Sequence, residues 1–184
     1  MRPPKGHTWG RRGCTPVVRV PAAGTKRVSM AALICTKAGR RPRLIYRIHL
    51  DRGPAKDRRK GFTEIDYARL LDAAHQQLGG PVVLVWDNVN THASRMMRRL
   101  IAARLWLNVC QLPPYAPEFN PVEGVWSPLK RSLANLTTHS LDQLTALMKT
   151  RLKRTQYRPH LIEGLIAKTG LDLQPPQPEP SKIF

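Results

Sequence analysis

Two acidic side chains lie next to or within expected secondary-structure elements, which would hold them rigidly. Both are of a type that binds hard metal cations. Asp87 comes directly after the apolar run 82–86, which is typical of a buried strand. Glu123 lies in the phrase PPYAPEFNPVEG, near the start of an expected helix. Carboxylate oxygens are the ligands that Mg²⁺ and similar cations prefer in proteins. The first question is therefore whether Asp87 and Glu123 belong to one metal site.

Each acid also has a structural interpretation that needs no metal. Asp87, followed by Asn88, is the kind of residue that begins a turn, because its side chain bonds nearby backbone. Asn120 and Pro121 suit the N-cap and the first position of a helix, and Glu123 then falls at the third position of a capping box. From the residues alone, the turn and the cap remain open alternatives to ligand roles.

The elements around these acids alternate between strands and helices in the second half of the chain. Thr63 and Asp66 predict a capped helix start, and Gly79 predicts its end. Such alternation favours an α/β sheet with parallel strands, whose ligands gather at the carboxyl ends of the strands. Consecutive strands in the first half favour antiparallel pairing. The predicted strands are 15–20, 27–36, 41–50, 82–86 and 105–112, and the predicted helices are 63–78, 92–104, one from about 121, and 140–154.

The chain is strongly basic, with 31 Lys and Arg against 12 Asp and Glu and a formal net charge of +19. This balance favours a polyanionic partner, and nucleic acid is the usual one. A basic protein without a nucleic-acid function is the alternative. The positive residues concentrate in 41–60, 95–104 and 149–154. The residues predicted to contact DNA are Arg41, Arg43, Arg47, Arg58, Arg59, Lys60, Arg98, Arg99, Lys130 and Arg131.

Other patterns bound the protein class. The length of 184 residues and the 41% hydrophobic content favour one globular domain. Three widely spaced cysteines argue against a disulfide framework or a zinc ribbon and favour a reducing, cytoplasmic setting. The first residues lack the apolar segment of a signal peptide, and no apolar run reaches the ~20 residues of a membrane helix.

Two stretches, VVLVWDNVNTH (82–92) and LPPYAPEFNPVEGVW (112–126), resemble bacterial insertion-sequence transposases of the mariner-like superfamily. The resemblance covers about residues 2–170. It implies an α/β fold, a ribonuclease H-like mixed sheet flanked by helices, for a catalytic domain spanning 1–170. A Pro-rich, disordered tail is expected over 171–184.

The resemblance also implies chemistry. Asp87 and Glu123, separated by the 35 residues 88–122, would be the second and third acids of a D-D-E triad that binds Mg²⁺ or Mn²⁺. The triad would cleave DNA and transfer strands during transposition, because paired cations activate the attacking oxygen and stabilise the leaving one. Transposon ends and target DNA would be the partners, a homodimer is compatible with the family, and the bacterial nucleoid would be the location.

The same resemblance predicts what this chain lacks. The family's first acid lies on a central strand just before the segment that matches 2–13, so we expect that strand, its Asp and the upstream helix-turn-helix region to be absent. Asp51, Glu64 and Asp66 are rejected as substitutes, because Asp51 would remain about 10–14 Å away at the usual strand spacing.

A helix-interior proline is a second departure. Pro128 lies inside the helix that begins near 121, and we expect it to kink that helix beyond Glu123.

Because the first acid of the triad is expected to be absent, the chain is predicted to be a transposase catalytic-domain fragment that is inactive alone. A non-catalytic basic DNA-binding protein, or a regulator derived from a transposase, is the alternative, and a stand-alone ribonuclease H-like nuclease is a third.

Overall fold

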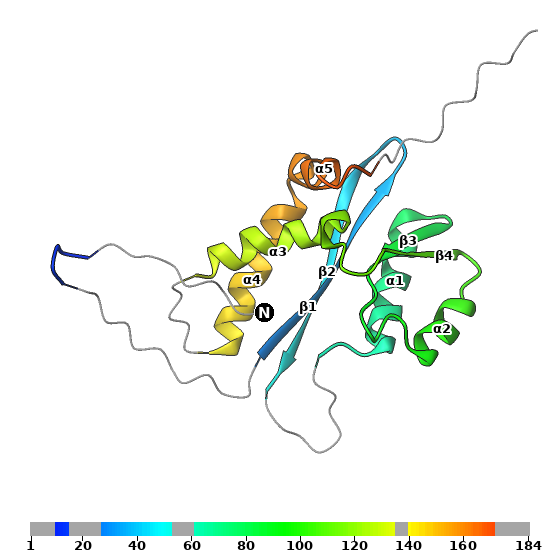
Figure 1. The fold of residues 1–184 in the computed structure, drawn as a ribbon, viewed down its shortest axis with the longest axis horizontal. Coiled ribbons are helices and arrows are strands. Elements are labelled where there is room, and N and C mark those ends of the chain that lie inside the picture. The colour runs from blue at the N-terminus through cyan, green and yellow to red at the C-terminus, as the bar shows by residue number, and fades with distance from the viewer. Residues whose placement is uncertain (1–9, 15–26, 53–60, 135–139, 172–184) are drawn as a thin grey trace, which may run out of the picture.

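The computed structural model describes residues 10–14, 27–52, 61–134 and 140–171. The predicted strand 15–20, the predicted contacts Arg58, Arg59 and Lys60, and the tail beyond residue 171 lie outside these ranges. In chain order the elements are β1 (Arg27–Lys37), β2 (Arg40–Asp51), α1 (Glu64–Leu78), β3 (Val82–Trp86), α2 (Arg95–Ala102), β4 (Leu107–Gln111), the short 3-10 helix η1 (Pro117–Phe119), α3 (Pro121–Ser132), α4 (Leu141–Gln156) and α5 (Pro159–Ala167) (Figure 1).

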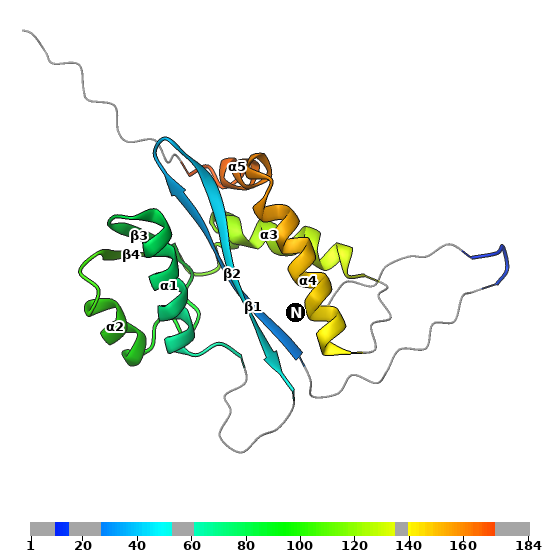
Figure 2. The same ribbon diagram turned by 180° about the vertical axis from the view of Figure 1, so that it is seen from behind.

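A long antiparallel hairpin of β1 and β2 lies at the centre of the structure. Gly39, with φ 71°, lies in its turn. Because side chains alternate along a strand, the hairpin presents two faces. Val28 and Leu44 pack against α3, α4 and α5, whereas Ala31 and Ile45 pack against α1. Figures 1 and 2 show the three C-terminal helices on one side of the hairpin and α1 on the other.

The segment β3–α2–β4 is a parallel strand–helix–strand unit. The register runs from Val82 opposite Leu107 to Trp86 opposite Gln111. Met97 of α2 is completely buried and packs with both strands and with α1. Since the strands are parallel, their carboxyl ends meet at one edge, and the residues that follow Trp86 and Gln111 lie side by side.

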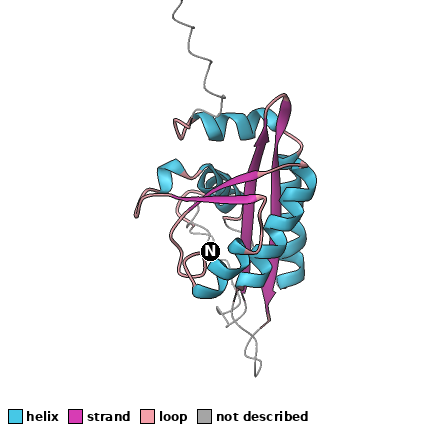
Figure 3. Ribbon diagram, turned by 90° about the vertical axis from the view of Figure 1, so that its right-hand side faces the viewer, coloured by secondary structure: helices cyan, strands magenta, loops and turns pink. Residues whose placement is uncertain are grey.

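The mixed α/β class, with antiparallel pairing first and parallel pairing second, is confirmed. The predicted single sheet is wrong for the described residues, where β1 pairs with β2 and β3 pairs with β4 in two separate sheets. Figure 3 shows the two strand pairs running in different directions. The physical reason is that no described strand lies between β1 and β3 to hydrogen-bond with both. The absence of the family's first central strand stays a prediction.

The helices differ from the predicted ones in three details. Helix α2 begins at Arg95 instead of residue 92, because hydrogen bonds from His92 and Ala93 to the carbonyl of Val89 hold the preceding segment in a turn. Met96 is 44% exposed although its spacing of four from Leu100 favours an inward position, because its neighbour Met97 takes the core-facing position. Helix α5 was not predicted.

Helix α1 begins as predicted. Thr63 and Asp66 form the reciprocal capping box, and Gly79 ends the helix in the left-handed conformation with φ 63°. Ile65, however, is 45% exposed although its spacing from Ala68 favours an inward position, while Leu70 takes a buried position. The cap is set by local chemistry, whereas the buried face depends on where the hairpin lies.

No helix within the described ranges is long and apolar enough to cross a lipid bilayer. All three cysteines are free thiols, so the predicted absence of a disulfide framework is confirmed. Burial raises the pKa of the Cys35 thiol to about 11.

Candidate active site: a pocket lined by Asp87 and Glu123

The carboxyl ends of β3 and β4 and the start of α3 line a pocket of about 410 Å³, which we call the acidic pocket. Asp87 follows β3 directly, and Glu123 lies in the first turn of α3. The rest of the wall comes from Asn88, Val89 and the loop 112–120 that leads from β4 to α3. The structure therefore brings the two acids singled out by the sequence to one pocket.

The side chain of Asp87 is oriented by hydrogen bonds from the loop that follows it. Its Oδ1 accepts a hydrogen bond from His92 Nδ1 at 2.9 Å and a weaker one from the Val89 N–H at 3.4 Å. The second contact is the turn bond of the structural alternative, so Asp87 does act as a turn residue. Its Oδ2 has no hydrogen-bond partner among the described residues, and the side chain is 43% exposed. One oxygen is thus fixed while the other is available to a cation.

His92 lies against Asp87 with its ring packed between two aromatic side chains. The ring stacks on Trp86 with centroids 4.2 Å apart and meets Tyr67 edge-on at 4.7 Å. Nδ1 faces Oδ1 and, at 3.2 Å, the backbone oxygen of Asp87; both are acceptors, so Nδ1 carries the proton. Burial raises the pKa of the Tyr67 hydroxyl, and the nearby charge of Asp87 raises it further.

Glu123 is exposed at the start of α3. Asn120 caps the helix by accepting from the Val122 N–H at 3.1 Å, and Pro121 takes the first position. The predicted capping box is wrong, because the Asn120 side chain accepts from the Val122 N–H and the Asn120 N–H donates to the Pro117 carbonyl instead of to the Glu123 carboxylate. The Glu123 carboxylate is therefore not used by the cap and lines the acidic pocket.

Helix α3 holds Glu123 in place through its buried face. Val125, Trp126 and Leu129 are buried against the hairpin and the other C-terminal helices, as the apolar spacing predicts. A Cβ on Gly124 would lie 2.5 Å from Leu165 Cδ2, so the absence of a side chain lets α5 approach closely. The helix continues through Pro128 to its end, and the kink stays a prediction.

The loop 112–120 is tied to the end of β3. The Leu112 N–H donates to the Trp86 carbonyl at 2.8 Å, and Asn88 Nδ2 donates to the Leu112 carbonyl at 2.6 Å. Tyr115 has φ 58°, and among the described residues no other non-glycine has a positive φ. Its side chain is fully exposed on the pocket wall. Sequence reasoning gave no role to His92 or Tyr115.

No third acid joins the pair in the part of the chain that the structure describes, which contains no group of three or more His, Cys, Asp or Glu able to hold a metal. Asp51 is buried and pairs with Arg27 at 3.3 Å, Glu64 is buried, and Asp66 belongs to the Thr63 cap. None of these three lines the acidic pocket. The two carboxylates are chemically suitable ligands for Mg²⁺ or Mn²⁺, since both cations take oxygen ligands. They would fill only some of the six coordination positions of Mg²⁺.

The predicted DNA contacts that the structure describes lie on three separate elements: β2, α2 and α3. All are exposed except Lys130, which is partly buried, and none lines the acidic pocket. Whether they contact DNA stays a prediction. These residues are Arg41, Arg43, Arg47, Arg98, Arg99, Lys130 and Arg131.

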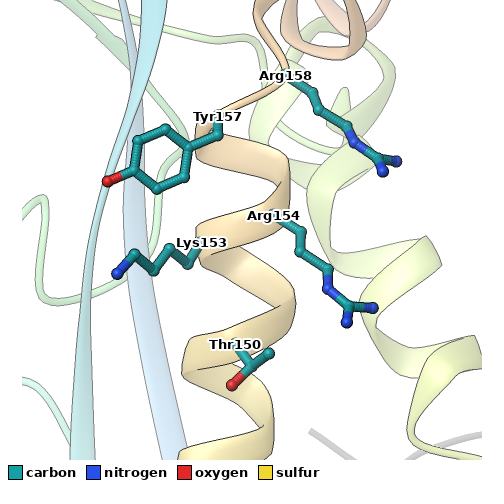
Figure 4. A pocket seen from close by; sticks show the side chains of 5 residues that line it. All are labelled: Thr150, Lys153, Arg154, Tyr157 and Arg158. Carbon is teal, nitrogen blue, oxygen red and sulfur yellow. The ribbon is translucent and has the colours of Figure 1, made fainter.

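A second pocket, of about 370 Å³, lies along the C-terminal turns of α4 and is lined by Thr150, Lys153, Arg154, Tyr157 and Arg158; we call it the basic patch. Figure 4 shows Lys153 and Tyr157 pointing to one side of the helix and Arg154 and Arg158 to the other. Lys153 Nζ lies 5.8 Å from the centroid of the Tyr157 ring. The sequence marks 149–154 as basic, but Tyr157 and Arg158, which follow the end of α4, were not predicted to belong to this surface.

Residues 1–145 match the family described as DDE superfamily endonuclease. The chain belongs to this family. The match contains Asp87, Glu123 and the whole acidic pocket. No curated protein sequence matches this DDE-family chain.

Two solved structures of Mos1 transposase are similar to this chain. The crystal structure of the Mos1 mariner paired end complex with Mn is 15% identical, with a TM-score of 0.52, and the match covers 94% of this chain and 53% of that one. The Mos1 transposase catalytic domain with raltegravir and Mn is 14% identical, with a TM-score of 0.46, over 80% of this chain and 84% of that one. The first likeness supports a shared fold, and this DDE-family chain spans about half the length of that relative.

Proposed function

We propose that residues 1–170 form part of the catalytic domain of a transposase, which cleaves and joins DNA strands with Mg²⁺ or Mn²⁺ at the acidic pocket. The observation that carries this proposal is that Asp87 and Glu123, separated by 35 residues in a DDE-family chain, line one pocket. DNA as the partner is supported by the net charge of +19. A DNA partner is also supported by the likeness to the Mos1 mariner paired end complex. That complex was solved with Mn, which supports a divalent cation.

In this proposal each residue of the pocket has a separate role. Asp87 and Glu123 hold the cation, and His92 fixes the orientation of Asp87 through its Nδ1–H. A bound divalent cation supplies an activated oxygen nucleophile and stabilises charge on the leaving oxygen. Asn120 and Pro121 set the direction in which α3 starts and so place Glu123 at the pocket.

We further propose that a complete site needs a third acid, on a strand ending in Asp between β1 and β3, which the described residues do not supply. The separation of the two sheets supports this, because within the described ranges β1 and β3 each pair with one neighbour only. Two-metal catalysis needs two cations held about 3.5–4 Å apart, and two carboxylates constrain such a pair poorly. The 184-residue chain alone is therefore expected to bind DNA without nicking it.

The test compares this chain with a version extended at its N-terminus by a strand that ends in Asp. Plasmid nicking with Mg²⁺ or Mn²⁺ is expected only from the extended protein. Asp87→Asn and Glu123→Gln should each reduce that nicking by at least about 10²-fold, because small errors of placement already cost this much. DNA affinity should be retained. Asp142→Asn is the control, since Asp142 is a surface acid of α4 paired with Arg52.

Three outcomes would count against parts of the proposal. Nicking by the 184-residue chain that disappears on Asp87→Asn would show that the site is already complete. Nicking by the extended protein that survives both substitutions would remove Asp87 and Glu123 from the chemistry. DNA binding without nicking in either version would favour a non-catalytic regulator.

A further inference from the structure

Tyr115 combines three properties that the fold itself does not explain. Its φ of 58° lies in the left-handed region, where a side chain crowds the following carbonyl and Gly or Asn is usual. Its side chain is fully exposed, so packing against described residues does not offset this strain. It also lines the acidic pocket together with Asp87 and Glu123. Strained residues that their surroundings hold in place cluster at functional sites.

The chain around Tyr115 holds its backbone in this conformation. Pro113, Pro114 and Pro117 each fix a φ angle. Upstream, Leu112 is bonded to both Trp86 and Asn88, and downstream the loop enters η1. The ring is therefore presented at the pocket by a constrained loop, which keeps the ordering cost of binding low.

The surroundings of the ring favour one class of ligand. The pocket volume of about 410 Å³ is within the range that takes a nucleotide-sized ligand. The net charge of +19 favours a polyanion. A free aromatic ring beside the path of a nucleic-acid backbone stacks on bases, and it needs an unpaired base because bases within a duplex are already stacked.

We propose that Tyr115 is a nucleobase-stacking residue that holds an unpaired base of the DNA strand whose backbone lies at Asp87 and Glu123. This inference rests on the proposed function, since it takes DNA to be the occupant of the acidic pocket. The substrate would then be a strand that is frayed, flipped or single-stranded next to the phosphate that reacts. Tyr157 differs, because it caps the C-terminus of α4 with a negative φ of −86° and has Lys153 beside its ring.

The experiment measures binding of a single-stranded oligonucleotide carrying 2-aminopurine, in EDTA so that no metal-dependent cleavage takes place. Wild type and Tyr115→Phe should bind alike and quench the 2-aminopurine fluorescence. Tyr115→Ala and Tyr115→Gly should bind about 5- to 150-fold more weakly, the range for loss of one base–aromatic stack. Affinity for a fully paired duplex of the same sequence should be nearly unchanged.

Two variants guard against effects on folding. Tyr115→Gly suits the positive φ, so its unfolding midpoint should be no lower than that of wild type. Leu105→Ala removes another fully exposed apolar side chain, at the opposite end of β4, and should bind both probes as wild type does.

The proposal is overturned if Tyr115→Ala keeps wild-type affinity and quenching, or if Tyr115→Phe loses as much as Tyr115→Ala. It is also overturned if Tyr115→Ala loses duplex affinity to the same extent, since stacking on an unpaired base predicts a difference between the probes. Ring-dependent binding together with no nicking by the extended protein would contradict the proposed function alone. Nicking together with ring-independent binding would contradict the role of Tyr115 alone.

Discussion

The acidic pocket and the basic patch differ in how the chain builds them. All residues that line the basic patch come from 150–158, the last turns of α4 and the two residues that follow it, so one short stretch of chain brings them together. The acidic pocket takes residues from the end of β3, the loop 112–120 and the start of α3. It forms only when β3 and β4 pair in parallel and Asn120 caps α3. A local surface follows from sequence spacing, whereas a site shared by three elements requires the tertiary fold.

The two regions also differ in charge. The basic patch presents two Arg on one side and one Lys beside an aromatic ring on the other, a combination that suits a phosphate backbone. The acidic pocket presents two carboxylates, which suit a cation. If the regions act separately, substitutions in one should leave the function of the other unchanged.

The largest expected effect is on the salt dependence of DNA binding. Wild-type affinity should fall by about 10³-fold between 50 and 200 mM salt if about six phosphates are contacted. The triple variant Lys153→Gln, Arg154→Gln, Arg158→Gln should lower the slope of log K against log salt by up to ~2.7, or 0.9 for each lost phosphate contact. Fluorescence anisotropy with a labelled duplex at four salt concentrations measures the slope.

The matched control for this prediction is Asp87→Asn, which should keep the wild-type slope. Mn²⁺ binding should in turn be unchanged in the triple variant when DNA is absent. A triple variant with the wild-type slope would show that the basic patch makes no phosphate contacts. The assignment of DNA-backbone binding to the basic patch would then be wrong.

The second effect is on metal affinity. His92→Ala should weaken Mn²⁺ binding by about 10- to 100-fold, because removing a partner that orients a ligand typically costs this much. His92→Asn should recover part of the loss, since its amide can donate to Asp87 from near the position of Nδ1. Calorimetry and the electron paramagnetic resonance of free Mn²⁺ measure the affinity without relying on catalysis.

His75 provides the control for this substitution. Its ring also stacks on a tryptophan, Trp106, with centroids 4.0 Å apart, but its Nδ1 faces the backbone carbonyl of Gly80 at 2.9 Å. His75→Ala should therefore cost comparable packing and leave Mn²⁺ affinity unchanged. Equal losses of affinity in both alanine variants would mean that His92 acts through stability and not by orienting Asp87.

The smallest effect is on the free energy of unfolding, through an ion pair between α1 and the segment just before β4. Arg104, just before β4, donates to both oxygens of Asp72 in α1 at 2.7 and 2.8 Å. These hydrogen bonds lower the pKa of Asp72 below its usual value. Because the folded-state pKa is the lower one, the stabilisation is present above the unfolded pKa of ~3.9 and is lost as the pH falls through the folded value.

Asp72→Asn should accordingly lower the free energy of unfolding by about 0.5–1 kcal/mol at pH 7, a figure that allows for solvent screening of a partly exposed pair. The difference from wild type should disappear once the pH is below the folded pKa. Urea unfolding at both pH values tests this. A difference that stays constant with pH would mean that the hydrogen-bond geometry, and not the charge of Asp72, carries the stability.

Local features could be predicted from the sequence because neighbouring residues decide them. The Thr63–Asp66 capping box and the Gly79 stop of α1 are set within a single turn of chain. Helix α5 could have been found in the same way, since Pro159 stands at a favoured first position, but its short length gave no clear period. The shared pocket of Asp87 and Glu123 followed from strand-end position and motif together.

Features that depend on distant or unusual contacts could not be predicted. The spacing of five between Asp87 and His92 is a period of neither a helix nor a strand, so their hydrogen bond arises only from the turn that links them. The left-handed φ of Tyr115 contradicts the preference of its residue type. The separation into two sheets also escaped prediction, because hydrophobic spacing identifies strands without identifying their partners.

If the acidic pocket holds a cation and the protein binds DNA, as proposed, the charge of the chain should couple the two binding steps. Asp87 and Glu123 are two of only 12 acids in a chain of net charge +19, so the long-range field of the free protein repels a divalent cation. DNA neutralises that field over distances up to a Debye length of about 8 Å at physiological ionic strength. Bound DNA should therefore raise the affinity for the cation, and by reciprocity the cation should raise the affinity for DNA by the same factor. The proposed cation site should then fill at a lower cation concentration in the DNA complex than in the free protein.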